Sequence, residues 1–173
     1  YEAKAKTLSQ SRKQAAKALS GTVTRSMQSL NMQGGVFDIS IQDCPPSSKG
    51  SDQVEFLVAG HPGVKPQPIQ KVASGGELAR ISLAITVNTV QNTAVPTLIF
   101  DEVDSGIGGA VAETVGKYLR QLAGSKQVLC VTHLPQVAAQ GHQHFQISKQ
   151  IVGGRTKSVI QALTEESRVM EIA

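Results

Sequence analysis

The chain has 173 residues, with 17 Lys and Arg against 13 Asp and Glu, so its formal net charge is +4. This length is enough for a domain with its own core, and a content of 40% hydrophobic and 17% charged residues excludes a wholly disordered chain. Four Phe, two Tyr and no Trp argue against a nucleic-acid reader that stacks bases on aromatic side chains, while the lack of any apolar run near about 20 residues predicts a cytoplasmic protein without a membrane partner.

Residues 1 to 31 predict one long helix, because they contain no Pro and are rich in Ala, Lys, Gln and Ser. Their apolar residues recur at spacings of three and four, which fits either the end of a coiled-coil arm or a solvated amphipathic helix. The first 35 residues carry six basic side chains against one acidic side chain, so the rest of the chain is close to neutral. These basic side chains could contact DNA phosphates or form only a solvated flank; they are Lys4, Lys6, Arg12, Lys13, Lys17 and Arg25.

Two strands, 36–41 and 54–59, are expected next and should pair as an antiparallel hairpin. The composition of residues 43–52 between them predicts a loop, and residues 60–68 hold too much Pro and Gly to be regular. From Glu77 to Thr89 apolar residues spread around most of a helix, so we expect this helix to be buried on more than one side.

Beyond residue 96, strands and helices alternate. The expected strands are 97–100, 127–132, 145–149 and 157–162, and the expected helices are 109–123, 135–140 and a last one from 165. Apolar strands separated by helices predict an α/β fold with a mostly parallel sheet flanked by helices. The chain stops inside the last predicted helix, so we expect it to be a piece of a longer protein.

The first candidate site is the run Ser74-Gly75-Gly76-Glu77 at the start of the buried helix. Two glycines let a ligand approach the backbone, and the first N–H groups of a helix attract an anion. The same run also fits a capping box, in which Ser74 and Glu77 satisfy the helix end without any ligand. On these residues alone the capping box is the commoner explanation.

The second candidate site follows the apolar strand 97–100, where Asp101, Glu102 and Asp104 stand within four residues. Ligands bind at the carboxyl ends of strands in open parallel sheets. Asp101 could hold a hydrated Mg²⁺ there, and Glu102 could orient or deprotonate a water. A strand ending in solvated acids is the simpler alternative, but three neighbouring acids repel one another and a cation or a metal-bound phosphate would relieve that repulsion. We therefore favour a functional site.

Histidines and cysteines supply weaker candidates. His133 follows the strand 127–132 and should lie near the same sheet edge as Asp101, although a lone His is more often structural. His142 and His144 share one face of a predicted strand and form a possible metal pair, but a third ligand is not evident. Cys130 is expected to be a small buried residue.

In their order along the chain, these motifs resemble the second half of an ABC-type ATPase head. Ser74 to Glu77 is similar to the signature motif, Asp101-Glu102 to the end of Walker B, Asp104 to the D-loop and His133 to the switch histidine. The amino-acid sequence around these motifs most resembles bacterial DNA-repair members of the SMC-like group, in which a long coiled coil interrupts the head. The stretches that carry this likeness are KVASGGELARISLAI (71–85), FDEVDSGIGG (100–109) and VTHLPQVAAQGHQHF (131–145).

The resemblance implies a division of the chain. Residues 1–33 would be the end of a coiled-coil arm, and residues 34–173 would be the C-terminal lobe of a P-loop NTPase head. No GxxxxGK[ST] occurs in the sequence, so the Walker A lobe would lie in another segment of the protein. The fragment alone is therefore expected to be inactive as an ATPase.

The resemblance also implies a role for each site residue. Asp101 would hold Mg²⁺ through water, Glu102 would activate the attacking water, and His133 would contact the γ-phosphate from the same side. Two heads would form a homodimer that sandwiches ATP, in which the opposing protomer presents its own signature run and places Asp104 at the seam. The residues expected to contact ATP across that seam are Ser74, Gly75, Gly76, Glu77 and Asp104.

The implied function is an Mg²⁺-dependent ATPase head that drives DNA double-strand-break repair on the bacterial nucleoid. Two other functions stay open. One is the nucleotide-binding subunit of an ABC transporter, which the basic helix argues against. The other is a non-catalytic dimerisation or DNA-binding fragment. The sequence leaves the DNA structure, whether single-stranded ends or duplex, and the coiled-coil length undetermined.

Overall fold

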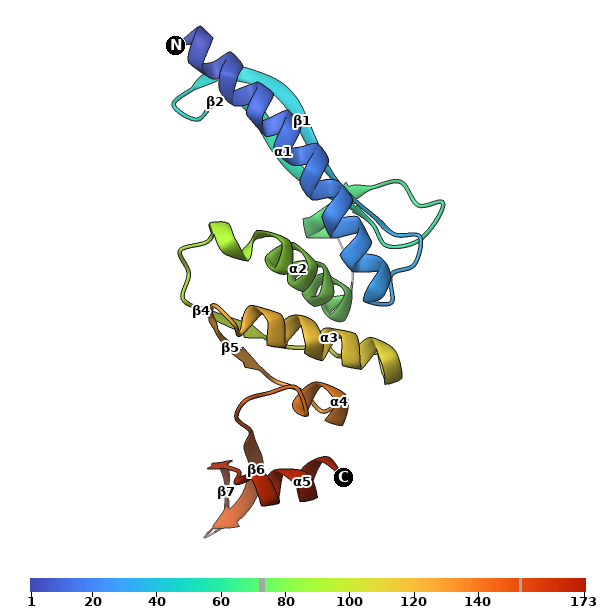
Figure 1. The fold of residues 1–173 in the computed structure, drawn as a ribbon, viewed down its shortest axis with the longest axis vertical. Coiled ribbons are helices and arrows are strands. Elements are labelled where there is room, and N and C mark those ends of the chain that lie inside the picture. Colours follow the sequence, from blue (N-terminus) through green and yellow to red (C-terminus); the bar gives the residue numbers. More distant parts are fainter. Residues whose placement is uncertain (72–73, 153) are drawn as a thin grey trace.

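The computed structural model describes residues 1–71, 74–152 and 154–173. Its elements follow one another along an elongated molecule, with the two termini at opposite ends (Figure 1). Val72 and Ala73, which belong to the predicted stretch 71–85, lie outside the described residues. In chain order the elements are α1 (Glu2–Ser29), β1 (Val36–Ser47), β2 (Gly50–Ala59), β3 (Gln67–Pro68), η1 (Ile69–Lys71), α2 (Gly75–Thr89), η2 (Val90–Asn92), β4 (Thr97–Phe100), α3 (Gly109–Leu122), β5 (Gln127–Cys130), α4 (Pro135–Ala138), β6 (Phe145–Val152), β7 (Arg155–Ala162) and α5 (Glu165–Ile172).

Helix α1 lies along the hairpin formed by β1 and β2 (Figure 1). Arg12 pairs with Asp52 at 3.0 Å between Nη1 and Oδ2, and Ser9 donates to the same carboxylate at 2.8 Å. These two contacts lower the pKa of Asp52, with the Ser9 hydrogen bond as the larger cause. The second half of α1 enters the core through Val23 and Met27, both fully buried. Whether residue 33 is a domain boundary stays a prediction, but α1 and the hairpin pack as one unit.

The antiparallel pairing of the first two strands is confirmed, but the loop predicted over residues 43–52 is wrong. Strand β1 continues to Ser47 and β2 begins at Gly50, with a register shift between Asp43 and Ser47. The reason is that β1 is an edge strand, since the sheet order is β1-β2-β3. Pro45 and Pro46 can sit in an edge strand at a bulge, because no neighbouring strand needs their missing N–H groups.

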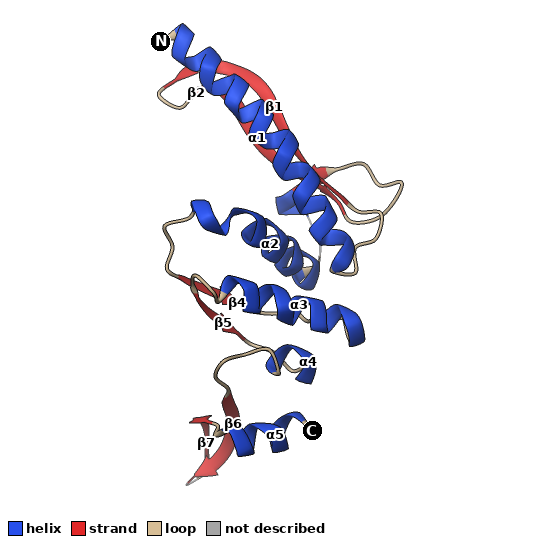
Figure 2. Ribbon diagram, in the orientation of Figure 1, coloured by secondary structure: helices blue, strands red, loops and turns tan. Residues whose placement is uncertain are grey.

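The middle of the chain forms the layer that positions the candidate site. Helices α2, α3 and α4 lie one above another beside the short strands β4 and β5 (Figure 2). Helix α3 buries one face at spacings of three and four, as the sequence predicts. Strands β4 and β5 are parallel, with Phe100 opposite Cys130. One face of this pair, including Phe100, packs on the core, whereas Ile99 and Leu129 on the other face are 71% and 47% exposed.

The C-terminal part of the chain differs from the single sheet implied by the alternating strands. Strands β6 and β7 form their own antiparallel hairpin, and the described strands fall into three sheets, of which only β4–β5 is parallel. No described residue from Phe145 onward is buried. The α/β fold class with a parallel sheet flanked by helices is confirmed, and its parallel part is one strand pair. Over the described ranges, no helix combines the length and the apolar character that a membrane span requires.

Candidate active site

The structure brings the three sequence motifs to one edge of the β4–β5 pair. Because these strands are parallel, the residues after Phe100 and those after Cys130 leave the same side of the sheet. The N-terminus of α2 meets this edge, since a Cβ atom built at Gly75 would collide with Oε2 of Glu102. The signature-like run, the acidic pair and the His133 segment therefore adjoin one another; the sequence predicted this only for the acidic pair and His133.

Ser74 starts α2 in the way that both sequence interpretations require. Its backbone is extended, and its hydroxyl accepts a hydrogen bond from the Glu77 amide at 3.4 Å. This is one half of a capping box; the helix that it starts has 15 residues, so its N-terminus carries a partial positive charge. Ser74 and Gly75 are both exposed, which leaves this helix end accessible to an anion.

The two glycines of this run are also required by the chain's own packing. A side chain at Gly75 would enter the space of the Glu102 carboxylate. A Cβ atom at Gly76 would come within 3.0 Å of the Ser105 Cβ and 3.1 Å of the Ser105 carbonyl oxygen. The close approach of α2 to residues 102–105 thus explains the glycine pair without a ligand, in addition to any role in binding one.

Asp101 and Glu102 present exposed carboxylates just beyond β4. The Asp101 Oδ1 atom accepts a hydrogen bond from the Glu102 amide at 2.9 Å. Glu102 has a φ of 57°, the left-handed region that non-glycine residues rarely adopt. A strained backbone of this kind persists only where the surrounding contacts hold it, and such residues cluster at functional sites.

Asp104 does not join the exposed acids, because its side chain turns into the protein. It is 2% exposed and accepts hydrogen bonds from the Thr132 hydroxyl and from the His133 amide, the latter at 3.1 Å. The repulsion among three acids is therefore relieved within the chain and needs no cation, contrary to the argument from sequence. Its expected contact with ATP across a dimer seam stays a prediction.

His133 lies over this buried carboxylate. Its Nδ1 atom is 3.4 Å from Oδ2 of Asp104, and its side chain is 71% exposed. Asp104 therefore faces the Nδ1 side of the ring and favours the tautomer with a proton there, which leaves Nε2 for contacts outside the chain. The sequence placed His133 at this edge but not above Asp104.

Arg80 is a residue that the motif search missed. It lies one helical turn after Gly76 on α2, is only 6% exposed, and donates from Nη1 to the Ser105 carbonyl at 2.7 Å. Burial lowers the pKa of its guanidinium, and nearby Glu77 opposes that effect. The signal in the sequence was a charged residue on a helix whose other neighbours, Ile81, Leu83 and Ala84, are apolar and buried.

The remaining candidates from sequence play no visible part in this edge. Cys130, which the sequence predicts to be buried, is half-buried, and burial, followed by the charges of Asp104 and Asp101, raises its thiol pKa to about 12. His142 and His144 lie in a bend before β6 and not on a strand face. Within the described part of the chain, no group of three His, Cys, Asp or Glu side chains is arranged to hold a metal, so Asp101 remains a single predicted ligand.

Comparison with known proteins gives close relatives of one kind. The chain is 51% identical over 172 residues to the DNA repair protein RecN of Xylella fastidiosa, covering 98% of this chain and 31% of that protein. It is 50% identical over 175 residues to RecN of Vibrio cholerae, covering 100% and 32% respectively. The chain thus spans about a third of the length of these relatives. No protein-family model matches it.

Solved structures with a similar fold include a head domain of an SMC protein and a chain of an SMC ATPase. The Smc head domain of Pyrococcus furiosus, solved with an extended coiled coil and bound to the C-terminal domain of ScpA, matches 90% of this chain and 37% of its own, with a TM-score of 0.61 and 21% identity. A chain from work on ATP-driven dimerization and DNA-stimulated activation of SMC ATPases matches 95% of this chain and 94% of its own, with a TM-score of 0.55 and 21% identity. At this identity the likeness concerns the fold alone.

Proposed function

This chain is a RecN-like segment with the fold of an SMC head, and we propose that it forms the C-terminal lobe of an ATPase head that acts in bacterial DNA repair. The observation that carries the proposal is the convergence of the α2 N-terminus, Glu102 and His133 at one edge of the β4–β5 pair. A transporter subunit is not favoured, because the close relatives are DNA repair proteins.

The residues at this edge fit ATP and Mg²⁺ as cofactors. Asp101 and Glu102 offer exposed carboxylate oxygens, the ligand type that Mg²⁺ prefers, and Asp101 would hold the ion through water. The exposed start of α2, with Ser74 and Gly75, would offer backbone N–H groups to a phosphate of the nucleotide held by a second protomer. Bound Mg²⁺·ATP would supply the transferable phosphoryl group and neutralise its charge.

The chain's own residues would divide the work between positioning and proton transfer. Glu102 would orient a water and accept its proton, as a general base does. His133, with Nδ1 directed at Asp104, would present Nε2 to a phosphate oxygen. Ser74 to Glu77 would face the nucleotide of a second protomer, so that ATP joins two heads, and the fall in phosphate contacts after hydrolysis would release them.

We assign the missing half of the site to an N-terminal lobe elsewhere in the full-length protein. The sequence holds no P-loop, so this chain alone would not hydrolyse ATP. The uncovered face of β4–β5, where Ile99, Leu129 and Val131 are 47 to 71% exposed, is the surface that such a lobe would bury. Burial of these side chains would stabilise the assembled head.

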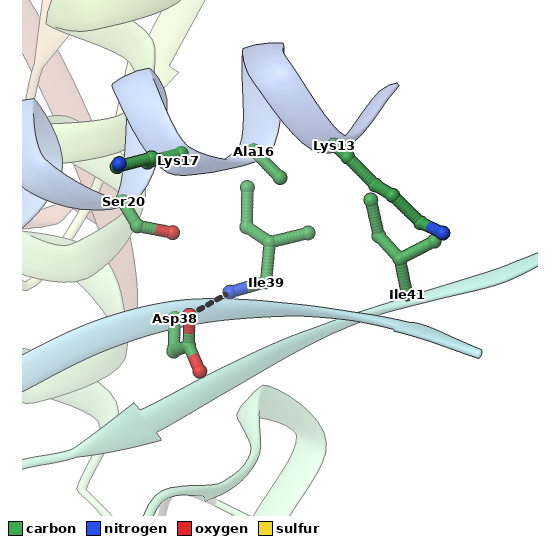
Figure 3. Close-up of a pocket in the computed structure, with 7 residues that line it drawn as sticks. All are labelled: Lys13, Ala16, Lys17, Ser20, Asp38, Ile39 and Ile41. Carbon is green, nitrogen blue, oxygen red and sulfur yellow. Dashed lines mark hydrogen bonds between the residues drawn. The ribbon is translucent and has the colours of Figure 1, made fainter. Parts of the chain in front are cut away.

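DNA is the partner that the basic helix α1 suggests, at the base of a coiled-coil arm. A groove of about 400 Å³ runs between α1 and β1, with Lys13 and Lys17 on the helix above Ile39 and Ile41 (Figure 3). Ser20 also lines it, and its buried hydroxyl has no hydrogen-bond partner among the described residues. The two ammonium groups would contact backbone phosphates without reading sequence. Such a protein would work on the bacterial nucleoid.

The direct test of the proposed function is Glu102→Gln in the full-length protein. We expect ATP turnover to fall by about 100-fold or more, because the general base is lost, while ATP-bound dimers accumulate. Glu113→Gln on α3 is a matched control, since Glu113 pairs at the surface with Lys117 and with no other residue in the described part of the chain, and it should leave turnover unchanged. Near-normal turnover in Glu102→Gln would refute the role of Glu102.

Two further measurements test the alternatives. ATP hydrolysis by the isolated chain would contradict the assignment of the P-loop to another lobe. Copurification of the full-length protein with a membrane-spanning partner would support the transporter interpretation.

A further inference from the structure

We propose that Arg80 is a positioning residue for the ATPase reaction: by binding the Ser105 carbonyl, it holds the turn that places Glu102 and Asp104. The inference rests on the proposed function, because it concerns the residues that would perform hydrolysis. Arg80 itself would touch neither nucleotide nor water.

The burial of Arg80 is the first observation. Its side chain is 94% buried, and no acid lies within ion-pairing distance of it among the described residues. The Nη1 atom donates to the Ser105 carbonyl at 2.7 Å, while Nε has no hydrogen-bond partner among those residues. A buried charge is unfavourable unless it is well paired, so an arginine that exists only for packing would be replaced at a gain by an apolar residue.

The second observation is that the Ser105 carbonyl belongs to the turn that carries Glu102 and Asp104. The amide of Ser105 bonds to the Glu102 carbonyl at 3.0 Å and closes a tight turn over residues 102–105. Arg80 binds the same residue from the other side, so Ser105 is held through both its N–H and its C=O groups. Within this turn, Glu102 has its left-handed backbone and Asp104 its bonds to Thr132 and His133.

These contacts make Arg80 the link between the signature-like helix and the acidic turn. Gly76 lies one helical turn before Arg80 and close to Ser105. A Cβ atom built at Gly76 would lie 3.0 Å from the Ser105 Cβ and 3.2 Å from Nη1 of Arg80. Without the guanidinium, the Ser105 carbonyl would lose its charged side-chain donor. The turn would then relax, Glu102 would leave its strained conformation, and the carboxylate of Asp104 would shift beneath His133.

The test compares Arg80→Met and Arg80→Lys in the full-length protein. Met fills the space of the side-chain stem without a donor, whereas Lys can still donate to the carbonyl. Hydrogen exchange is measured first, without nucleotide, over residues 101–107 and 132–134. We expect Arg80→Met to speed exchange in these two segments by about 10-fold or more, with β6 and β7 unchanged, and Arg80→Lys to restore part of the protection.

The second readout is steady-state kinetics. Because the nucleotide-cradling lobe is elsewhere, Arg80→Met should lower kcat by about 10-fold or more and leave KM for ATP within about 3-fold. Arg80→Lys should recover part of kcat. Arg120→Met is a matched control, since Arg120 is exposed and binds one backbone carbonyl, that of Gln140, at 3.0 Å. Arg120→Met should leave both hydrogen exchange at the turn and kcat unchanged.

Two outcomes would overturn the proposal. One is unchanged exchange at residues 101–107 in Arg80→Met, or in Arg80→Leu, which also lacks a donor, if the Met variant does not fold. The other is a uniform rise in exchange along the whole chain with kcat falling only in proportion to the folded fraction, which marks a merely structural residue. If the wild-type protein hydrolyses no ATP, the proposed function fails, while the exchange experiment still decides the role of Arg80.

Discussion

Glu102 combines a left-handed backbone, at a φ of 57°, with the carboxylate expected to activate water. An L-residue with a side chain in this conformation is less stable by roughly 1–2 kcal/mol than in the right-handed one, a cost that glycine does not bear. The contacts around it, from Gly75 on one side and Ser105 on the other, hold it in place. Stability and activity should therefore respond in opposite directions at this position.

We predict that Glu102→Gly raises the free energy of unfolding by about 1 kcal/mol and abolishes ATP turnover, because it removes strain and the proposed general base together. Glu102→Gln keeps the side chain and the strain, so its stability should stay within about 0.5 kcal/mol of the wild type. Urea unfolding of both full-length variants measures the difference. A Glu102→Gly variant less stable than Glu102→Gln would show that the backbone is not strained.

At the scale of residues, the sequence predicted which side chains gather but not how they point. The order of motifs along alternating strands and helices was enough to bring Glu102 and His133 to one edge, because parallel strands end on the same side, whereas the approach of Ser74 and Gly75 is seen only in the structure. It could not show that Asp104 turns inward, since that depends on the turn over residues 102–105. Arg80 was missed for the same reason: its partner is a backbone carbonyl, which no sequence motif displays.

Helix α1 shows, at the scale of elements, how packing divides residues that look alike in sequence. Arg12 is paired with Asp52 of the hairpin and so contributes to holding α1 in place. Lys13 and Lys17 are exposed and border the groove beside β1. The six basic residues grouped by composition therefore do not share one role. The helix itself was predictable from its composition. The full length of the hairpin on which it packs was not, because the Pro-containing half of β1 looks like a loop in the sequence.

We predict that Lys13→Gln with Lys17→Gln weakens DNA binding by the full-length protein. The negative slope of log affinity against log salt should become less steep by about 1.8 for duplex DNA, because each lost phosphate contact contributes about 0.9. Lys149→Gln with Lys157→Gln on β6 and β7 makes the same change in net charge at the other end of the chain and should have a much smaller effect. Equal weakening by the two double variants would mean that net charge alone attracts DNA and that the groove has no part.

At the scale of the whole molecule, the exposed apolar surface explains why the predicted sheet differs from the observed one. The apolar strands of the second half predict a mostly parallel sheet flanked by helices. In the structure β4 and β5 stand alone with one bare face, and the β6–β7 hairpin exposes Ile147 and Ile160 at 63% and 68%. Hydrophobicity reports the burial of a side chain in the complete protein, and this chain spans about a third of its relatives. The residues that would complete the sheet are therefore outside what its own sequence can predict.

A charge on the bare face should have different effects on the isolated chain and on the full-length protein. Ile99→Lys should change the stability of the isolated chain by no more than about 0.5 kcal/mol and improve its solubility, because residue 99 is already 71% exposed there. In the full-length protein the same substitution should cost at least about 2 kcal/mol and impair ATP binding, since a charge would replace an Ile that the proposed N-terminal lobe would bury. Val64→Lys, at a side chain 52% exposed in the loop before β3, is the control and should be neutral in both. If Ile99→Lys is as mild in the full-length protein as in the isolated chain, this face stays open to solvent and the N-terminal lobe packs elsewhere.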